Sequence, residues 1–165
     1  MHTDLEYDDP VAKEIIDLHV FFEDWFRGDC KNTDNVFKKR LMSRIDLDFY
    51  MVMPNGESFY GEQFWPEMRK AHGSNPKFQI SLRNFARKLQ IGRKTFVANY
   101  EEWQKDALNT KPANNGRVST AVFVTDSSAP NGVKWVHIHE TWLPAKLVKS
   151  EPFDWEFCAE GYRLE

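Results

Sequence analysis

The spacing of apolar residues changes from helical to strand-like near Leu47, and this change most constrains the fold. Before it, Asp9 and Pro10 predict the start of a helix and Gly28 predicts its end, since an acidic cap, an initial proline and a final glycine are typical of helix boundaries. The inward positions of this helix recur three or four residues apart: Val11, Ile15, Leu18, Phe22 and Trp25. Residues 32–44 predict a second, shorter helix.

Strands dominate the chain after Leu47. Asn55-Gly56 lies between two short strand-like runs and predicts a hairpin, and residues 62–72 predict a third helix. Four long runs of strand periodicity follow, at 77–91, 94–106, 117–126 and 134–143. Helices followed by consecutive strands predict an α+β fold, in which a curved mixed or antiparallel sheet wraps around the three helices as an open cone.

The composition predicts one soluble domain over residues 1–165, with a core at about 10–143. Hydrophobic residues at 41% and charged residues at 28% argue against disorder. The net charge of −3 gives no reason to expect a nucleic-acid partner, and no run approaches the roughly 20 apolar residues of a membrane span. Cys30 and Cys158 fit no paired metal or redox spacing, which favours free thiols in the cytoplasm over a disulfide.

The C-terminal extension, residues 145–165, is too aromatic to be a solvated tail. Its aromatic residues are Phe153, Trp155, Phe157 and Tyr162. One interpretation is that the extension packs back across the sheet or the third helix. The alternative is that it covers the mouth of the cone or swaps to a partner subunit.

The last strand contains two histidines in the run WVHIHETW. Because successive side chains of a strand point to opposite faces, Trp135, His137, His139 and Thr141 are expected on one face. The pair could bind a metal together with Glu102, act as a general acid or base, or fill a polar cavity. We expect both imidazoles on the concave face and no metal ion, because no other residues have matching ligand spacing.

The same alternation predicts an apolar patch on the convex face of the long strands. Its members are Val97, Trp103, Val136, Ile138 and Trp142. A contiguous apolar patch of this kind usually marks an interface, so we expect a homodimer formed through the sheet.

Three local features resemble the nuclear transport factor 2-like (NTF2-like) superfamily, which includes the ketosteroid isomerases and SnoaL-type polyketide cyclases. They are Asp48 with the following MPNGESFYG, the strand FVANYEEW, and the closing strand WVHIHETW. The resemblance covers residues 10–143 and implies a cystatin-like cone. In the kinase-association branch the closing strand carries histidines four and six places after its Trp; here these positions hold His139 and Thr141.

The resemblance also implies roles for particular residues. Asp48 matches the general base of the isomerases, and Tyr100 with Glu102 or His139 would hold the developing oxyanion. Trp25 would wall the pocket, which His137 and Thr141 would also line.

Two functions follow from this resemblance. The first is a cofactor-independent isomerase, cyclase or dehydratase that acts by proton transfer on a small apolar or carbonyl-containing molecule. The second is a noncatalytic domain that binds a ligand or mediates oligomerisation. The sequence does not choose between them.

Overall fold

The computed structural model describes residues 1–5 and 8–155. Four helices and one 3₁₀ turn accompany seven strands in the described residues. The elements in chain order are β1 (His2–Thr3), α1 (Pro10–Arg27), α2 (Asp34–Arg40), η1 (Met42–Arg44), β2 (Ile45–Val52), β3 (Ser58–Tyr60), α3 (Gly61–Lys70), β4 (Gln79–Ile91), β5 (Thr95–Lys105), β6 (Asn115–Thr125), β7 (Val133–Trp142) and α4 (Ala145–Ser150).

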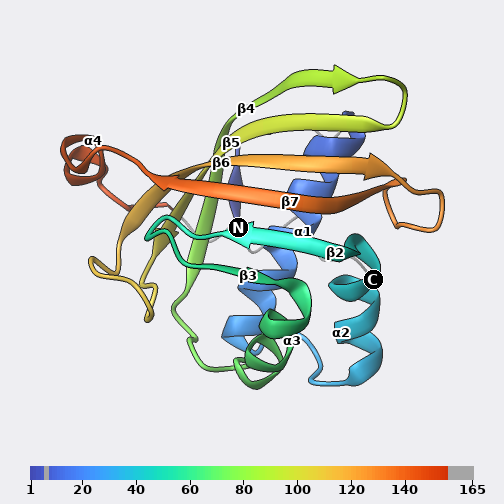
Figure 1. Ribbon diagram of the computed structural model, residues 1–165. Helices are drawn as coiled ribbons and strands as arrows, with labels where there is room; N and C mark the ends of the chain where they lie inside the picture. The colour runs from blue at the N-terminus through green and yellow to red at the C-terminus, as the bar shows by residue number, and fades with distance from the viewer. Residues whose placement is uncertain (6–7, 156–165) are drawn as a thin grey trace.

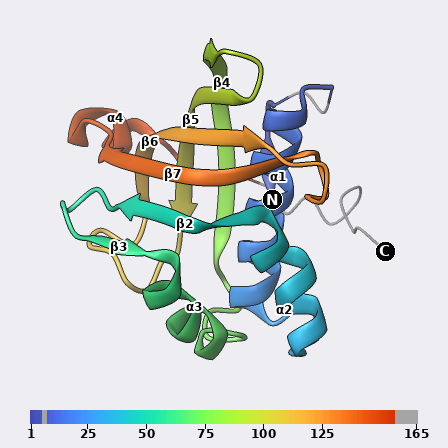
Figure 2. The ribbon, with the colours of Figure 1, turned by 45° about the vertical axis from the view of Figure 1, so that its right-hand side comes forward.

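The strands form a single curved sheet in the order β1-β4-β5-β6-β7-β2-β3. All neighbouring pairs are antiparallel except β1 with β4 and β2 with β7, which are parallel. The sheet bends around α1 without closing, and α2 and α3 lie together near one end of that helix (Figures 1 and 2). The predicted α+β cone with a curved mixed sheet is therefore confirmed.

Helix α1 begins and ends where the sequence predicts. The Asp9 carboxylate accepts hydrogen bonds from the backbone N–H groups of Val11 and Ala12, at 2.8 and 3.3 Å. Gly28 ends the helix in the left-handed region, with φ of 80°, which a residue without a Cβ adopts at little cost. These two caps fix where α1 begins and ends.

Trp25 lies in the core rather than in the wall of a pocket. Its side chain is fully buried, and its Nε1 donates a 2.7 Å hydrogen bond to the carbonyl of Met68 in α3. Its ring also packs on Phe21, Phe37 and His72. Trp25 thus joins α1, α2 and α3, and the prediction that it walls the pocket is wrong.

Strand β7 contains one extra residue relative to β6. Trp135 pairs with Phe123, but the next pair along β6 joins His137 to Val122, so Val136 has no partner of its own. Such a bulge reverses the alternation of side chains beyond it. After Trp135, Ile138 and Glu140 point to the concave side, and His137 and His139 do not.

Part of the C-terminal extension packs on the outer face of β4 and β5. The Arg83 guanidinium donates to both carboxylate oxygens of Glu151, at 2.8 and 3.0 Å. Phe153 lies against the buried Trp103, with ring centroids 6.0 Å apart, and also against Trp155. These contacts cover one of the positions predicted for the convex patch, while Phe157, Cys158 and Tyr162 lie outside the described residues.

We predict that Phe153→Ala lowers the free energy of unfolding by about 2–3 kcal/mol, somewhat less than for a central core phenylalanine, because the ring packs at the edge of the structure. Chemical denaturation followed by tryptophan fluorescence measures this, since Trp103 loses its cover. The matched change Leu147→Ala, on the exposed side chain of α4, should have little effect. An unchanged midpoint for Phe153→Ala would show that the contact with Trp103 contributes nothing.

Candidate functional site

A cavity of about 550 Å³ lies between α1, α3 and the concave face of the sheet. Most of its wall is apolar, from aromatic and methionine side chains on α1, β2, the β2–β3 turn and α3, together with Phe78 before β4. These include Phe22, Phe26, Phe49, Met51, Met53 and Phe64. Polar side chains gather at one part of the wall, which we call the polar floor: His19, Tyr100, Glu102, Gln104, Arg117 and Glu140.

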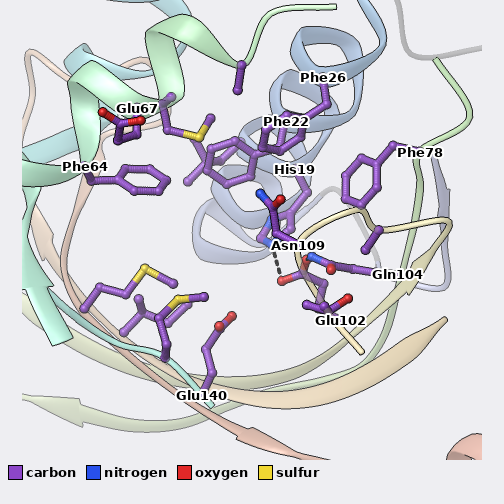
Figure 3. Close-up of a pocket in the computed structure, with 18 of the residues that line it drawn as sticks. His19, Phe22, Phe26, Phe64, Glu67, Phe78, Glu102, Gln104, Asn109 and Glu140 are labelled. Carbon is purple, nitrogen blue, oxygen red and sulfur yellow. Dashed lines mark hydrogen bonds and ion pairs between the residues drawn. The ribbon is translucent and has the colours of Figure 1, made fainter. Parts of the chain in front are cut away.

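His19 brings α1 into the polar floor. Its Nδ1 lies 2.7 Å from the carbonyl oxygen of Ile15, which can only accept, so Nδ1 carries a hydrogen. Its Nε2 is 3.3 Å from Glu102 (Figure 3). The same nitrogen is 3.4 Å from the hydroxyl of Tyr100. The helix turn below His19 therefore fixes which nitrogen faces the sheet.

Arg117 joins the remaining groups of the polar floor. Its Nη1 donates to Glu140 at 3.0 Å, and its Nη2 donates to the side-chain oxygens of Gln104 at 2.8 Å and Asn115 at 3.1 Å. Gln104 in turn donates to Glu102 at 2.6 Å. The Arg117 guanidinium is thus hydrogen-bonded directly to the Glu140 carboxylate. It is linked to the Glu102 carboxylate through the side-chain amide of Gln104.

Burial and this shared cation shift the two carboxyl groups in opposite directions. Burial raises the pKa of Glu140, and the negative charge of Glu102 raises it further, against the opposing effect of Arg117. Burial also opposes ionisation of Glu102, but Arg117, His19 and Gln104 together outweigh it and lower the pKa of that carboxyl. Glu102 is therefore the group of the pair that stays ionised, and Glu140 is the group that more readily takes up a proton.

Tyr100 completes the polar floor as a neutral group. Its side chain is fully buried, and burial, followed by the charges of Glu102 and Glu140, raises the pKa of the phenol well above its ordinary value. The phenol therefore keeps its proton and can donate a hydrogen bond. Tyr100 and Glu102 are the two residues of the predicted site that the structure brings together in the cavity.

The histidines of β7 lie on the other face. His139 is exposed, and His137 is half-buried against β2, where its Nδ1 donates to the Tyr50 carbonyl at 2.8 Å. Neither residue lines the cavity, and Thr141 is exposed as well. The prediction of a concave location for these three residues is wrong, because the extra residue Val136 reverses the alternation on which it rested.

The same bulge corrects the predicted convex patch. Ile138 lines the cavity, and Trp142 stacks on the guanidinium of Arg117, so both belong to the concave side. Val97 and Val136 are half-buried on the convex side, as expected from the alternation.

Asp48 lies outside the cavity. It sits exposed in β2, where its backbone N–H donates to the side chain of Asp46. The register with β7 is irregular between Ile45 and Tyr50, so the alternation of β2 is interrupted where Asp48 lies. The structure therefore does not bring Asp48 together with Tyr100 or Glu102.

Sequence reasoning missed His19, Arg117 and Glu140. His19 follows Ile15 by four residues and precedes Phe22 by three, so helical spacing alone places it on the inward face of α1. Arg117 alternates with Ser119, Ala121 and Phe123, a pattern typical of one strand face with a polar end. Glu140 gave no such signal, because its direction depends on the bulge.

A second buried charged cluster lies behind Trp135. Glu14 is fully buried and pairs with Arg44, and it accepts from Asn131 at 2.8 Å and from the Trp135 indole at 3.2 Å. Asn131 also donates to Asp17 at 2.8 Å. Despite these donors, burial raises the pKa of Glu14 to about 7.

Two further observations concern the described residues only. No group of three His, Cys, Asp or Glu side chains among them could hold a metal ion. None of their helices is both long enough and apolar enough to cross a membrane.

The curved sheet, the helices on its inner side and the cavity between them place the chain in the NTF2-like superfamily. An NTF-2 like protein of unknown function from Pseudomonas aeruginosa superposes with a TM-score of 0.70 and 26% identity, over 82% of this chain and 100% of that one. The CaMKII hub of S. rosetta superposes with a TM-score of 0.57 and 17% identity, over 79% and 95% of the two chains. The superfamily inferred from local sequence features is thereby confirmed.

Within this superfamily, the chain belongs to the sucrose-6-phosphate phosphohydrolase C-terminal family, whose profile matches residues 11–144. Sucrose-phosphatase 1 from Nicotiana tabacum is 24% identical over 150 residues, which make up 88% of this chain and 33% of the relative. The chain therefore spans about a third of the length of the curated relatives it matches.

We predict that stability falls as pH rises through the range in which Glu14 ionises. The pKa of Glu14 is raised from 4.5 to about 7, so the folded state holds a proton that the unfolded state has already lost. Between pH 4.5 and 8 the wild type should lose about 3 kcal/mol more unfolding free energy than Glu14→Gln, which cannot titrate. Urea denaturation at a series of pH values measures the difference, and parallel pH profiles for the two proteins would contradict it.

Proposed function

We propose that the cavity binds a small organic molecule that is mostly apolar and carries one hydroxyl or carbonyl end. The observation that carries this proposal is the placing of Glu102, Glu140 and Tyr100 at one side of a cavity whose wall is mostly aromatic and methionine side chains. Ligand sites are commonly apolar hollows with a few convergent polar groups. Buried charged groups also stabilise a fold poorly compared with apolar packing, so their presence here favours a functional reason.

The polar floor also suits proton transfer, the finer form of this proposal. A carboxyl group whose pKa is raised by burial can accept a proton next to a carbonyl, and a neutral phenol can donate to the oxygen where charge develops. Glu140 and Tyr100 have these properties, so they are the candidates for base and hydrogen-bond donor in an isomerase, cyclase or dehydratase reaction. Asp48 stays a predicted base from family resemblance alone.

The curated relatives are named sucrose-phosphatases, and we do not extend phosphate chemistry to this cavity. Arg117, the cation of the polar floor, is engaged by Glu140, Gln104 and Asn115. The cation at the rim, Lys70, is exposed and pairs with Glu67. Within the described residues, binding of the organic part of a ligand has more support than binding of a phosphate.

The binding proposal predicts that Glu140→Gln weakens binding of any cavity ligand about 10- to 100-fold, the usual effect of losing one hydrogen bond to a charged group. A ligand copurifying with the wild type, identified by native mass spectrometry, would supply the compound, and calorimetry would measure its affinity. His139→Gln is the matched control, because it changes the neighbouring residue on the opposite face. If both variants lost the same amount of ligand affinity, the polar floor would not be part of the binding site.

A second candidate function is self-association through the convex face, favoured by the structural match to a kinase hub domain. Residues 151–155 already cover the outer face of β4 and β5 near Trp103, so a second copy would contact β6, β7 and β2. Val122, Val136 and His139 point outward there. The predicted homodimer would form through this face. Two of the apolar residues expected there, Ile138 and Trp142, lie on the concave side instead.

The association proposal predicts that Val136→Glu dissociates the oligomer, because it places an unpaired charge in the contact. Sedimentation velocity at micromolar concentration measures this, with Lys88→Glu on the exposed end of β4 as the control. A wild type that sediments as a monomer would contradict the proposal.

The cytoplasmic location predicted from the cysteines stays a prediction. Cys30 is a free thiol in the structure. Cys158 lies outside the described residues.

A further inference from the structure

We infer that the polar floor of the cavity selects a neutral ligand that donates a hydrogen bond, such as an alcohol, and rejects carboxylates and phosphates. This inference rests on the proposed binding function and names the chemical class of ligand for the same site. It follows from which hydrogen-bonding groups of the floor are engaged within the protein and which have capacity left.

The guanidinium and amide donors of the floor are engaged within the protein or out of a ligand's reach, and the Tyr100 hydroxyl that remains is a neutral donor. Arg117 directs Nη1 to Glu140 and Nη2 to Gln104 and Asn115. Its Nε has no hydrogen-bond partner, but it is buried and exposes no surface to a ligand. The Gln104 amide nitrogen donates to Glu102 at 2.6 Å. An anionic ligand would need such donors, and it would have to displace a carboxylate or an amide oxygen to reach them.

The carboxylate oxygens of the floor can accept further hydrogen bonds. Each carboxylate oxygen can accept about two hydrogen bonds. Glu140 Oε1 accepts only a long hydrogen bond of 3.4 Å from the Ser119 hydroxyl, and Glu102 Oε2 lies 3.3 Å from Nε2 of His19. Figure 3 shows the Glu140 side chain rising from the sheet with its carboxylate end toward the open space, facing the aromatic side chains of α1 and α3. A ligand hydroxyl placed there finds an acceptor for its hydrogen.

The charges of the polar floor also favour a neutral ligand. Two carboxylates already share one guanidinium and the His19 imidazole in a buried setting. An added anion would be repelled by both carboxylates, and Arg117 and His19 already face them. A protonated amine would be attracted by the carboxylates, but it would also be placed near Arg117 and lose its hydration against an apolar wall. A neutral hydroxyl avoids both penalties, which is why we assign the site to an alcohol.

A series of compounds with one apolar body tests the inference on the wild-type protein. The probes are 2-(1-naphthyl)ethanol, its methyl ether, 1-naphthylacetate, 2-(1-naphthyl)ethylamine and 2-(1-naphthyl)ethyl phosphate. We expect the alcohol to bind about tenfold or more tightly than each of the others, because only it donates a hydrogen bond without carrying charge. NMR titration, with the Ile138 methyl resonances as the marker of the cavity, measures each affinity.

The variant Glu140→Gln should change this selectivity rather than abolish binding altogether. The neutral amide removes one negative charge and loosens the hold on Arg117, so the preference for alcohol over carboxylate should fall by about tenfold or more. His139→Gln, on the opposite face of β7, should keep the wild-type preference. Thermal unfolding of both variants checks that they remain folded, and the wild-type series stands even if Glu140→Gln does not fold.

The outcomes separate this inference from the function on which it rests. A carboxylate, phosphate, ether or amine that binds in the cavity as tightly as the alcohol would overturn the inference and leave the binding function intact. If no compound of the series perturbs Ile138 at millimolar concentration, the binding function itself fails, and the inference fails with it.

Discussion

The extra residue Val136 in β7 decides which side chains of the closing strand face the cavity. A strand without it would turn His137 and His139 inward and Glu140 outward, as simple alternation predicts. With the bulge, Trp135 keeps its place on the inner face, and Ile138 and Glu140 follow it there. The Glu140 carboxyl group therefore faces Arg117 and the cavity only because the register between β6 and β7 shifts by one residue.

The polar floor depends on contacts between elements distant in the sequence. His19 comes from α1, Glu102 from β5, Arg117 from β6 and Glu140 from β7, and each is buried. Removing one partner of such a cluster leaves a buried charge uncompensated, which commonly destabilises a protein by about 3–5 kcal/mol. The apolar wall tolerates exchanges between apolar side chains of similar volume better, since these usually cost less than about 1.5 kcal/mol.

Most of the fold could be predicted from the sequence, because its signals are local. Asp9, Gly28 and Asn55-Gly56 mark boundaries by their own chemistry, and the alternation of β5 correctly placed Tyr100 and Glu102 on one face. His19 could have been found by helical spacing. The faces of β7 could not, since Val136 is an ordinary β-branched strand residue and a bulge depends on pairing with β6. Trp25 was misplaced for a related reason: its spacing shows that it is inward, but not whether it meets a cavity or another helix.

The inward direction of β7 after the bulge is the central claim, and thiol labelling of adjacent positions tests it most directly. Ile138→Cys and His139→Cys would each be made in a Cys30→Ser, Cys158→Ser background and treated with a small maleimide under native conditions. The structure predicts rapid labelling of His139→Cys, on the exposed face, and slow labelling of Ile138→Cys, whose parent side chain is only 6% exposed. Rapid labelling of Ile138→Cys with protection of His139→Cys would show regular alternation in β7 and would contradict the account.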